Sequence, residues 1–208
     1  LLTWLRSAGA PYAVAGPSLA LAAARLDSPT GDAALADFLL QVRRERAALT
    51  AALRAAPGAV VWPSQANFVF CRFRDPVGAT LVRDGLLALG INVRAFTSGP
   101  AAGGLRITCP GTEAGLARLL AALAALFQPR GFVADEGLDC EPIGLGPATG
   151  DGPTWVLSAN PERLTAARAA GHLPIAVVPP GDDPRAWQER GFGLALRSDE
   201  LPRLAALR

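Results

Sequence analysis

The spacing of apolar residues between Thr30 and Phe127 switches repeatedly between helical and strand-like patterns, and this order constrains the fold most. Thr30 to Ala56 predicts a long amphipathic helix, which Pro57 and Gly58 end. Its apolar residues at helical spacing are Leu35, Phe38, Leu39, Val42, Leu49 and Leu53. The following segments predict strands at 59–62 and 67–73, a helix at 77–89, strands at 91–96 and 105–108, and a helix at 112–127. This succession predicts a compact α+β layer in which helices pack on one small sheet.

Composition indicates a folded protein and argues against two classes of partner. Of the 208 residues, 50% are hydrophobic and 18% are charged, which is typical of an α/β domain. The 20 basic residues are all arginines and are balanced by 18 acidic residues. The only basic cluster, Arg43 to Arg46, spreads around the predicted helix and indicates a solvated face, so we expect no nucleic-acid partner. No apolar run reaches the ~18–20 residues of a membrane span, so we expect no membrane partner and a cytoplasmic location.

The cysteines and the acidic residues do not form a pattern that predicts a metal site. Cys71, Cys109 and Cys140 are odd in number and widely separated, without a CxxC or Cys/His ligand spacing. They predict buried or inert thiols in a reducing cytosol rather than a disulfide framework or a zinc centre. Asp182 and Asp183 lie among proline and glycine, where turn formation is the expected role.

The composition changes after about Pro129, and we expect two parts, residues 1–129 and 130–208. Gly131 to Pro153 is rich in glycine, proline and acidic residues and is predicted to be loop-like. Beyond it the pattern alternates between β and α. The predicted elements are strands at 154–158, 174–178 and 193–196 and helices at 160–170, 184–189 and 199–207.

Four short stretches, in the right order over nearly 120 residues, carry a resemblance to a known family. Pro63-Ser64-Gln65-Ala66-Asn67-Phe68 is similar to the "PS-x-ANF" strand of histidinol-phosphate aminotransferases. Gly90-Ile91-Asn92-Val93-Arg94 resembles their "G-I-x-V-R", and Leu105-Arg106-Ile107-Thr108 resembles their "L-R-I-T". Pro11-Tyr12-Ala13-Val14 resembles the "P-Y-x-V" that opens the family's link between domains.

The resemblance implies an α/β fold, with residues 1–129 as the small C-terminal domain of a fold-type I class I/II aminotransferase that depends on pyridoxal 5'-phosphate (PLP). It implies a small-molecule amino-acid substrate, histidinol phosphate or a related amino acid, with 2-oxoglutarate as the acceptor, and a homodimer. Arg94 and Arg106 match arginines that bind the substrate's acidic end. A guanidinium suits that role because its planar fork of donors matches carboxylate or phosphate. Asn67 is expected to be a structural residue near the substrate, and Tyr12 is expected to contact ligand or to pack at the domain junction.

The sequence lacks one group that this chemistry requires. PLP enzymes begin with a lysine Schiff base, and this sequence contains no lysine. Because the sequence also opens Leu-Leu-Thr-Trp, we expect a fragment or a truncated reading frame, inactive by itself, with the cofactor held by an upstream domain.

The tail resembles the end of a haloacid-dehalogenase-like (HAD) phosphatase. The resemblance rests on a strand at Trp155–Ser158, an Ala-Ala-Arg-Ala-Ala-Gly helix end at 166–171 and the following Leu173-Pro174-Ile175. The segment from Gly131 to Gly137 resembles a degenerate form of the family's opening motif "F-D-x-D-G". Ala134 takes the nucleophile position, and Glu136 takes the position of the second aspartate. Phosphoryl transfer there needs a carboxylate nucleophile and a carboxylate-bound Mg²⁺, so we expect a degenerate, non-catalytic β/α remnant.

Two rival hypotheses remain open at this stage. The chain could be a non-catalytic interaction or regulatory remnant of an aminotransferase–HAD fusion. The second rival is a phosphatase, but the sequence lacks the carboxylates that this activity requires at the nucleophile and Mg²⁺ positions.

Overall fold

The computed structural model describes residues 15–138 and 143–208 and divides the chain into two compact units, Leu1–Gln41 and Val42–Arg208. Long helix α3 (Pro29–Arg54) begins in the first unit and ends in the second.

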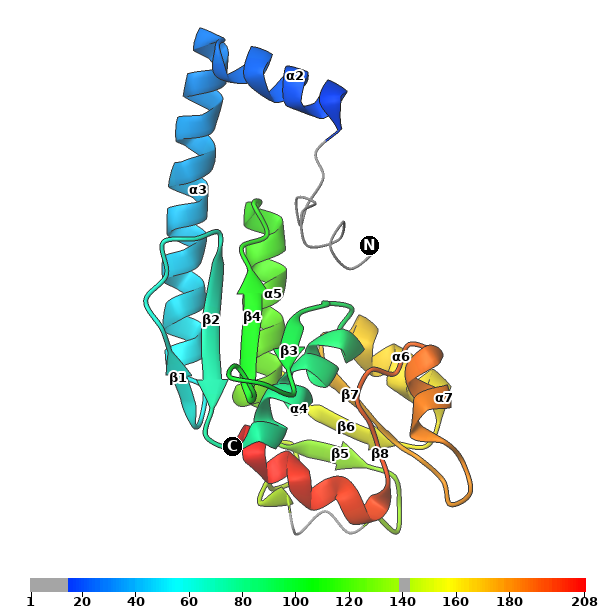
Figure 1. The fold of residues 1–208 in the computed structure, drawn as a ribbon. Helices are drawn as coiled ribbons and strands as arrows, with labels where there is room; N and C mark the ends of the chain where they lie inside the picture. The colour runs from blue at the N-terminus through cyan, green and yellow to red at the C-terminus, as the bar shows by residue number, and fades with distance from the viewer. Residues whose placement is uncertain (1–14, 139–142) are drawn as a thin grey trace. The chain divides into compact units, whose positions relative to one another are not determined.

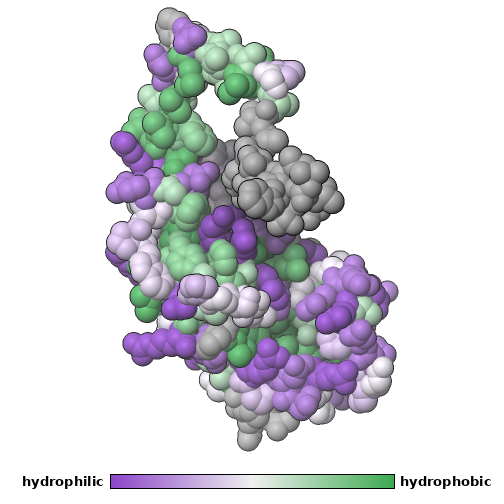
Figure 2. All heavy atoms as spheres, viewed as in Figure 1, coloured by the Kyte–Doolittle hydropathy of each residue, from purple (hydrophilic) through white to green (hydrophobic). Residues whose placement is uncertain are grey.

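The first unit contains a helix that the sequence patterns did not predict, α2 (Gly16–Leu26), which begins with Pro17 in its first turn. None of its residues is buried. The apolar residues at the start of α3 are also exposed, with Leu35 at 43% and Phe38 at 49%. Figure 2 shows the corresponding apolar surface along α2 and the start of α3. Of the predicted apolar stripe on α3, only Val42, Leu49 and Leu53 are buried.

After the end of α3, the second unit contains a four-stranded antiparallel sheet (Figure 1). Its strands, in the spatial order β1-β2-β4-β3, are β1 (Ala59–Val61), β2 (Phe68–Phe73), β4 (Gly104–Thr108) and β3 (Arg94–Phe96). Helices α4 (Pro76–Ala88) and α5 (Glu113–Phe127) follow β2 and β4 in the chain. The predicted order of helices and strands and the α/β fold class are confirmed.

One face of this sheet is buried and the other is open. Along β2, Val69, Cys71 and Phe73 are buried whereas Phe68 and Phe70 are only half-buried, because successive residues of a strand point to opposite faces. The buried side chains join those of α3, α4 and α5 in one core. The helices begin where capping residues satisfy their first amides. Asp75 accepts from Val77 N on α4, and Thr112 accepts from Gly115 N on α5.

A second sheet, formed by the tail, is parallel. Its strands lie in chain order as β5 (Phe132–Ala134), β6 (Trp155–Ser158), β7 (Leu173–Val177) and β8 (Ala195–Leu196). Between and after them come α6 (Pro161–Ala169), α7 (Pro184–Glu189) and a 3₁₀ helix, η2 (Ser198–Leu207). The predicted β/α alternation after residue 154 is confirmed. The prediction that 131–153 is loop-like was wrong for β5, whose three residues pair with the apolar strand β6.

Both sheets of the second unit contribute to one apolar core, which also includes Leu126 of α5 and Trp155 of β6. The Trp155 indole Nε1 donates to the carbonyl of Ala125 at 2.9 Å, so this large ring is buried without an unpaired donor. Cys71 and Cys109 are free and buried, as expected, whereas Cys140 lies outside the described residues. Burial raises the pKa of the Cys71 thiol to about 12.

The prediction that residues 43–46 form a solvated face was wrong for Glu45. Glu45 is fully buried rather than solvated, and its carboxylate accepts from Gly111 N at 2.8 Å. Arg46 donates to the Ala66 carbonyl. Glu45 and Arg46 therefore connect α3 to neighbouring loops through hydrogen bonds. Among the described residues, no helix is long and apolar enough to cross a membrane.

Candidate functional site

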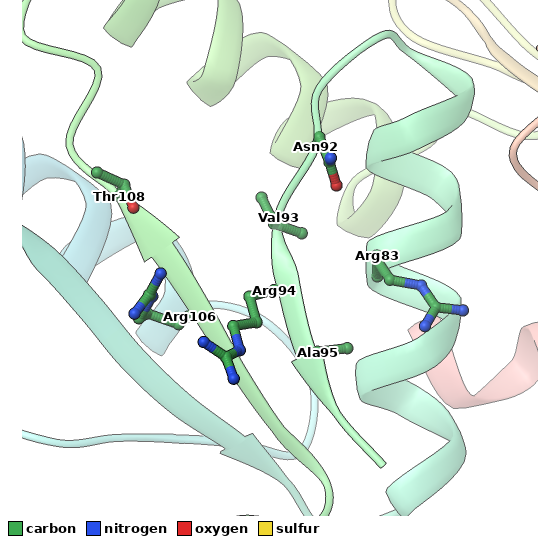
Figure 3. Close-up of a pocket in the computed structure, with 7 residues that line it drawn as sticks. All are labelled: Arg83, Asn92, Val93, Arg94, Ala95, Arg106 and Thr108. Atoms are coloured by element: carbon green, nitrogen blue, oxygen red, sulfur yellow. The ribbon is translucent and has the colours of Figure 1, made fainter. Parts of the chain in front are cut away.

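Arg94 and Arg106 face each other across neighbouring strands. The Gly103 amide donates to the Phe96 carbonyl at 2.9 Å and closes the hairpin between β3 and β4, with Gly103 at a φ of +76°. This register makes Arg94 the direct partner of Arg106. Cross-strand partners in an antiparallel pair lie on one face, with their Cα atoms about 4.5–5.5 Å apart. The hairpin therefore places two positive charges side by side, as Figure 3 shows.

A cavity of about 450 Å³ opens beside these two arginines. It is lined by Arg83, Asn92, Val93, Arg94, Ala95, Arg106 and Thr108. Asn92, Thr108 and Arg83 were not predicted to be site residues. Asn92 and Thr108 could have been found, because each lies two residues from a predicted arginine and strand side chains share a face at that spacing. Arg83 comes from α4, and no spacing links it to the strands.

Aromatic rings pack against the two guanidinium groups on the open face of the sheet. The Arg94 guanidinium carbon lies 4.9 Å from the centre of the Phe96 ring, and that of Arg106 lies 5.4 Å from the centre of Phe68. Phe70 lies 5.8 Å from Phe96 in an edge-on arrangement and continues this aromatic layer. These rings keep the arginines on the face without neutralising them.

The charge of the pair is not balanced by any acidic side chain among residues 15–138 and 143–208, since neither arginine forms an ion pair there. The Arg106 Nε is buried and has no hydrogen-bond partner. Arg83 differs, because its Nη2 lies 2.7 Å from Asp84 Oδ1 and it extends away from the pair (Figure 3). Burial raises the pKa of Asp84 above its ordinary value, and the neighbouring Arg83 opposes that rise.

Two adjacent guanidinium groups and a buried N–H without an acceptor are groups that can bind an anion. Like charges directly opposite each other across strands are destabilising, and a buried donor without a partner costs about 1–3 kcal/mol. A carboxylate or phosphate would offset both costs, because it accepts several charge-assisted hydrogen bonds at once.

Of the other two predicted site residues, Asn67 is not among the residues that line this cavity. Asn67 is exposed and immediately precedes β2, where its backbone carbonyl accepts from Cys109 N at 2.8 Å. Tyr12 lies outside the described residues.

Comparison with known proteins identifies the family. The profile of "Aminotransferase class I and II" matches residues 1–123, which is more than half of the chain. The chain belongs to this family.

Three curated relatives, all named histidinol-phosphate aminotransferase, are 38% identical to this chain over 125 residues. One comes from Xanthomonas axonopodis pv. citri (strain 306), and two come from Xanthomonas oryzae pv. oryzae, strains MAFF 311018 and KACC10331 / KXO85. The match covers 59% of this chain and 33% of each relative, so the chain matches about a third of their length.

Class I and II aminotransferases generally depend on PLP. The residues of this chain do not fit that cofactor by themselves, because none of the 208 is a lysine that could bind its aldehyde. The charges beside the cavity of Arg94 and Arg106 suit a small anion instead. No chemical step through PLP is therefore assigned to these residues.

A second polar cluster lies in the tail, at the carboxyl ends of β5 and β6. The Asp135 carboxylate accepts from Ser158 Oγ at 2.8 Å and from Ala159 N at 2.9 Å, and it forms an ion pair with Arg163. Burial acts to raise the pKa of Asp135, but these hydrogen bonds and the Arg163 charge outweigh it and hold the pKa below the ordinary value. Both carboxylate oxygens are thus engaged by protein groups.

Proposed function

We propose that this chain supplies the substrate-anion site of a PLP-dependent aminotransferase of the histidinol-phosphate type. The enzyme would transfer an amino group between histidinol phosphate, or a related amino acid, and 2-oxoglutarate. Residues 1–129 would form its small domain, and residues 130–208 would form a HAD-like remnant. The observation that carries the proposal is the cross-strand pair Arg94–Arg106, beside a cavity and without an acidic partner among the described residues.

In this proposal the two arginines bind and orient, and the chemistry is the cofactor's. Bound PLP supplies an electron sink for the carbon that carries the amino group. Arg106 would bind the substrate's acidic group through its buried Nε and its terminal nitrogens, and Arg94 would supply the second charge from β3. Holding the anion in one place fixes the direction in which the substrate's amino group points, which is the main contribution that binding makes to such a reaction.

For residues 130–208 we propose a second candidate function, a non-catalytic interaction or regulatory role. Asp135 lies between Ala134 and Glu136, and Ser158, Ala159 and Arg163 already donate to its carboxylate oxygens. Three donors on these oxygens draw charge from the carboxylate and occupy three of its about four acceptor sites, which weakens it both as a nucleophile and as a metal ligand.

The test of the aminotransferase proposal uses a chimera that joins this chain to the part of the Xanthomonas axonopodis relative that the match leaves uncovered. The chimera is supplied with PLP, histidinol phosphate and 2-oxoglutarate, and glutamate formation is measured. We expect activity with the parent sequence and a loss of kcat/KM of about 100-fold or more for Arg106→Gln, since charge-assisted hydrogen bonds to the substrate are removed.

The matched control is Arg54→Gln, which removes the same charge from the exposed last turn of α3. It should leave kcat/KM within about twofold of the parent, as expected for a surface position outside the site. A soluble, PLP-binding chimera that transfers no amino group, or in which Arg106→Gln behaves like Arg54→Gln, would contradict the proposal.

A further inference from the structure

A second pair of arginines meets on the surface at the end of α4. Gly90 ends this helix in the left-handed conformation, with a φ of +76°, and its amide donates to the Leu87 carbonyl. A methyl group placed on Gly90 would lie 2.8 Å from Arg118 Nη2 and 2.9 Å from Arg168 Nη2. Because both nitrogens are that close to one point, the guanidinium groups of α5 and α6 are close neighbours.

Carbonyl groups at the end of α4 accept hydrogen bonds from one of these two arginines. Arg118 Nη2 donates to the carbonyls of Leu89 and Gly90, each at 3.2 Å, as expected for a cation at the negative end of a helix. Within residues 15–138 and 143–208, no side-chain hydrogen bond or ion pair of Arg168 accompanies these contacts. A second positive charge thus reaches the same point without an acceptor of its own.

Neighbouring side chains do not neutralise the pair. On a helix, the residues three and four positions away are the ones that can form ion pairs. For Arg118 these are Ala114, Gly115, Ala121 and Ala122, and for Arg168, which is near the end of α6, they are Leu164 and Thr165. None is acidic, and neither arginine forms an ion pair with any other described residue.

A small cavity lies between the two arginines. Its volume is about 170 Å³, and Leu89, Ile91, Ala122 and Gly171 line it together with Arg118 and Arg168. At a water's share of about 30 Å³, that is room for about five heavy atoms, which is the size of a phosphate or sulfate ion. An ion there would accept one charge-assisted hydrogen bond of about 2.8 Å from each guanidinium.

We propose that Arg118 and Arg168 form a binding site for a small tetrahedral oxyanion, with inorganic phosphate as its probe. This site joins α5 of the aminotransferase segment to α6 of the tail and is separate from the cavity of Arg94 and Arg106. The bound ion would tie the two helices together, so that phosphate stabilises the fold. The proposal does not depend on the proposed aminotransferase function.

The experiment titrates the full chain with sodium phosphate at pH 7 by calorimetry, at an ionic strength held constant with sodium chloride. The double variant Arg94→Gln/Arg106→Gln removes the other arginine pair, so its remaining phosphate binding reports on this site alone. We expect one phosphate per chain in that variant, and at least a tenfold weaker affinity when Arg168→Gln is added. Adding Arg54→Gln instead, with the same change in charge, should leave the affinity unchanged.

The outcomes separate this site from its alternatives. Arg168→Lys keeps the charge but not the planar fork, and it should bind phosphate with intermediate affinity. Circular dichroism verifies that each variant is folded. Absence of phosphate binding in the Arg94→Gln/Arg106→Gln variant, or equal binding with and without Arg168→Gln, would overturn the proposal. Equal binding would leave the two arginines as a cap on α4. Acetate in place of phosphate tests the ion's shape, and an equal affinity for acetate would also overturn the proposal, because it would show a carboxylate site.

Discussion

Replacing Arg106 by methionine separates a binding role from a structural one, because the two roles predict opposite effects on stability. Methionine keeps an unbranched apolar stem in the half-buried position on β4 but removes the charge and the buried Nε–H that lacks a partner. Without ligand, the loss of an unpaired buried donor is worth about 1–3 kcal/mol in favour of the folded state. The relief of repulsion across the strands from Arg94 adds about 0.2–1 kcal/mol.

Two losses act against this gain. The interaction of Arg106 with the Phe68 ring is worth about 0.5–1 kcal/mol at a partly exposed site. The unfolded chain also changes, which contributes a few tenths of a kcal/mol. The balance predicts that Arg106→Met leaves the free energy of unfolding unchanged or raises it by up to about 3 kcal/mol.

Urea unfolding at pH 7, followed by circular dichroism with and without 2-oxoglutarate, measures both effects. In the parent chain the anion should raise the unfolding midpoint, and in Arg106→Met it should not, because a ligand stabilises only the state that binds it. A variant destabilised by more than about 1 kcal/mol would refute the reasoning, since a residue that mainly holds the fold together shows that loss. An anion-dependent midpoint in Arg106→Met would refute it equally.

Two further predictions concern other parts of the second unit. Asp135→Asn should lower the free energy of unfolding at pH 7 by about 1–2 kcal/mol, because it removes the partly exposed ion pair with Arg163 and weakens the bonds to Ser158 and Ala159. Because the native pKa of Asp135 is lowered, this contribution is present above the ordinary pKa of about 4 and is lost as pH falls through the native value. Urea titrations at pH 7 and pH 3 should therefore show a difference between parent and variant that narrows in acid, and a difference independent of pH would contradict the assignment. Cys71, whose thiol pKa is about 12, should resist alkylation at pH 8 in the native chain and react in urea, which mass spectrometry of the labelled peptides would show; rapid labelling of the folded chain would mean that it is not buried.

The elements of the second unit could be predicted from sequence because their signals are local. The helices at 77–89 and 112–127 are set by apolar spacing and by Asp75 and Thr112 at their starts, and both formed within one residue of the prediction. The strand β5 was missed because it has only three residues, too few for a period to be visible. Glu45 was misassigned because an acidic residue on a helix is usually solvated, whereas here its acceptor role for Gly111 is fulfilled inside the fold.

The candidate site divides in the same way. Arg94 and Arg106 were predicted from two short motifs, residues 90–94 and 105–108, and Asn92 and Thr108 belong to those motifs. That Arg94 is the direct partner of Arg106 depends on the register of the hairpin, which the turn at Gly103 sets.

By itself, the sequence determined most of the helices and strands of the second unit and the two short motifs that contain Arg94 and Arg106, because those signals lie between residues close together in the chain. Only the tertiary structure decided that Arg106 has a buried nitrogen without a partner, and that Arg118 and Arg168, 50 residues apart, meet over Gly90. Burial and convergence depend on how separate helices and strands pack, and that packing is a property of the whole unit that local spacing does not contain.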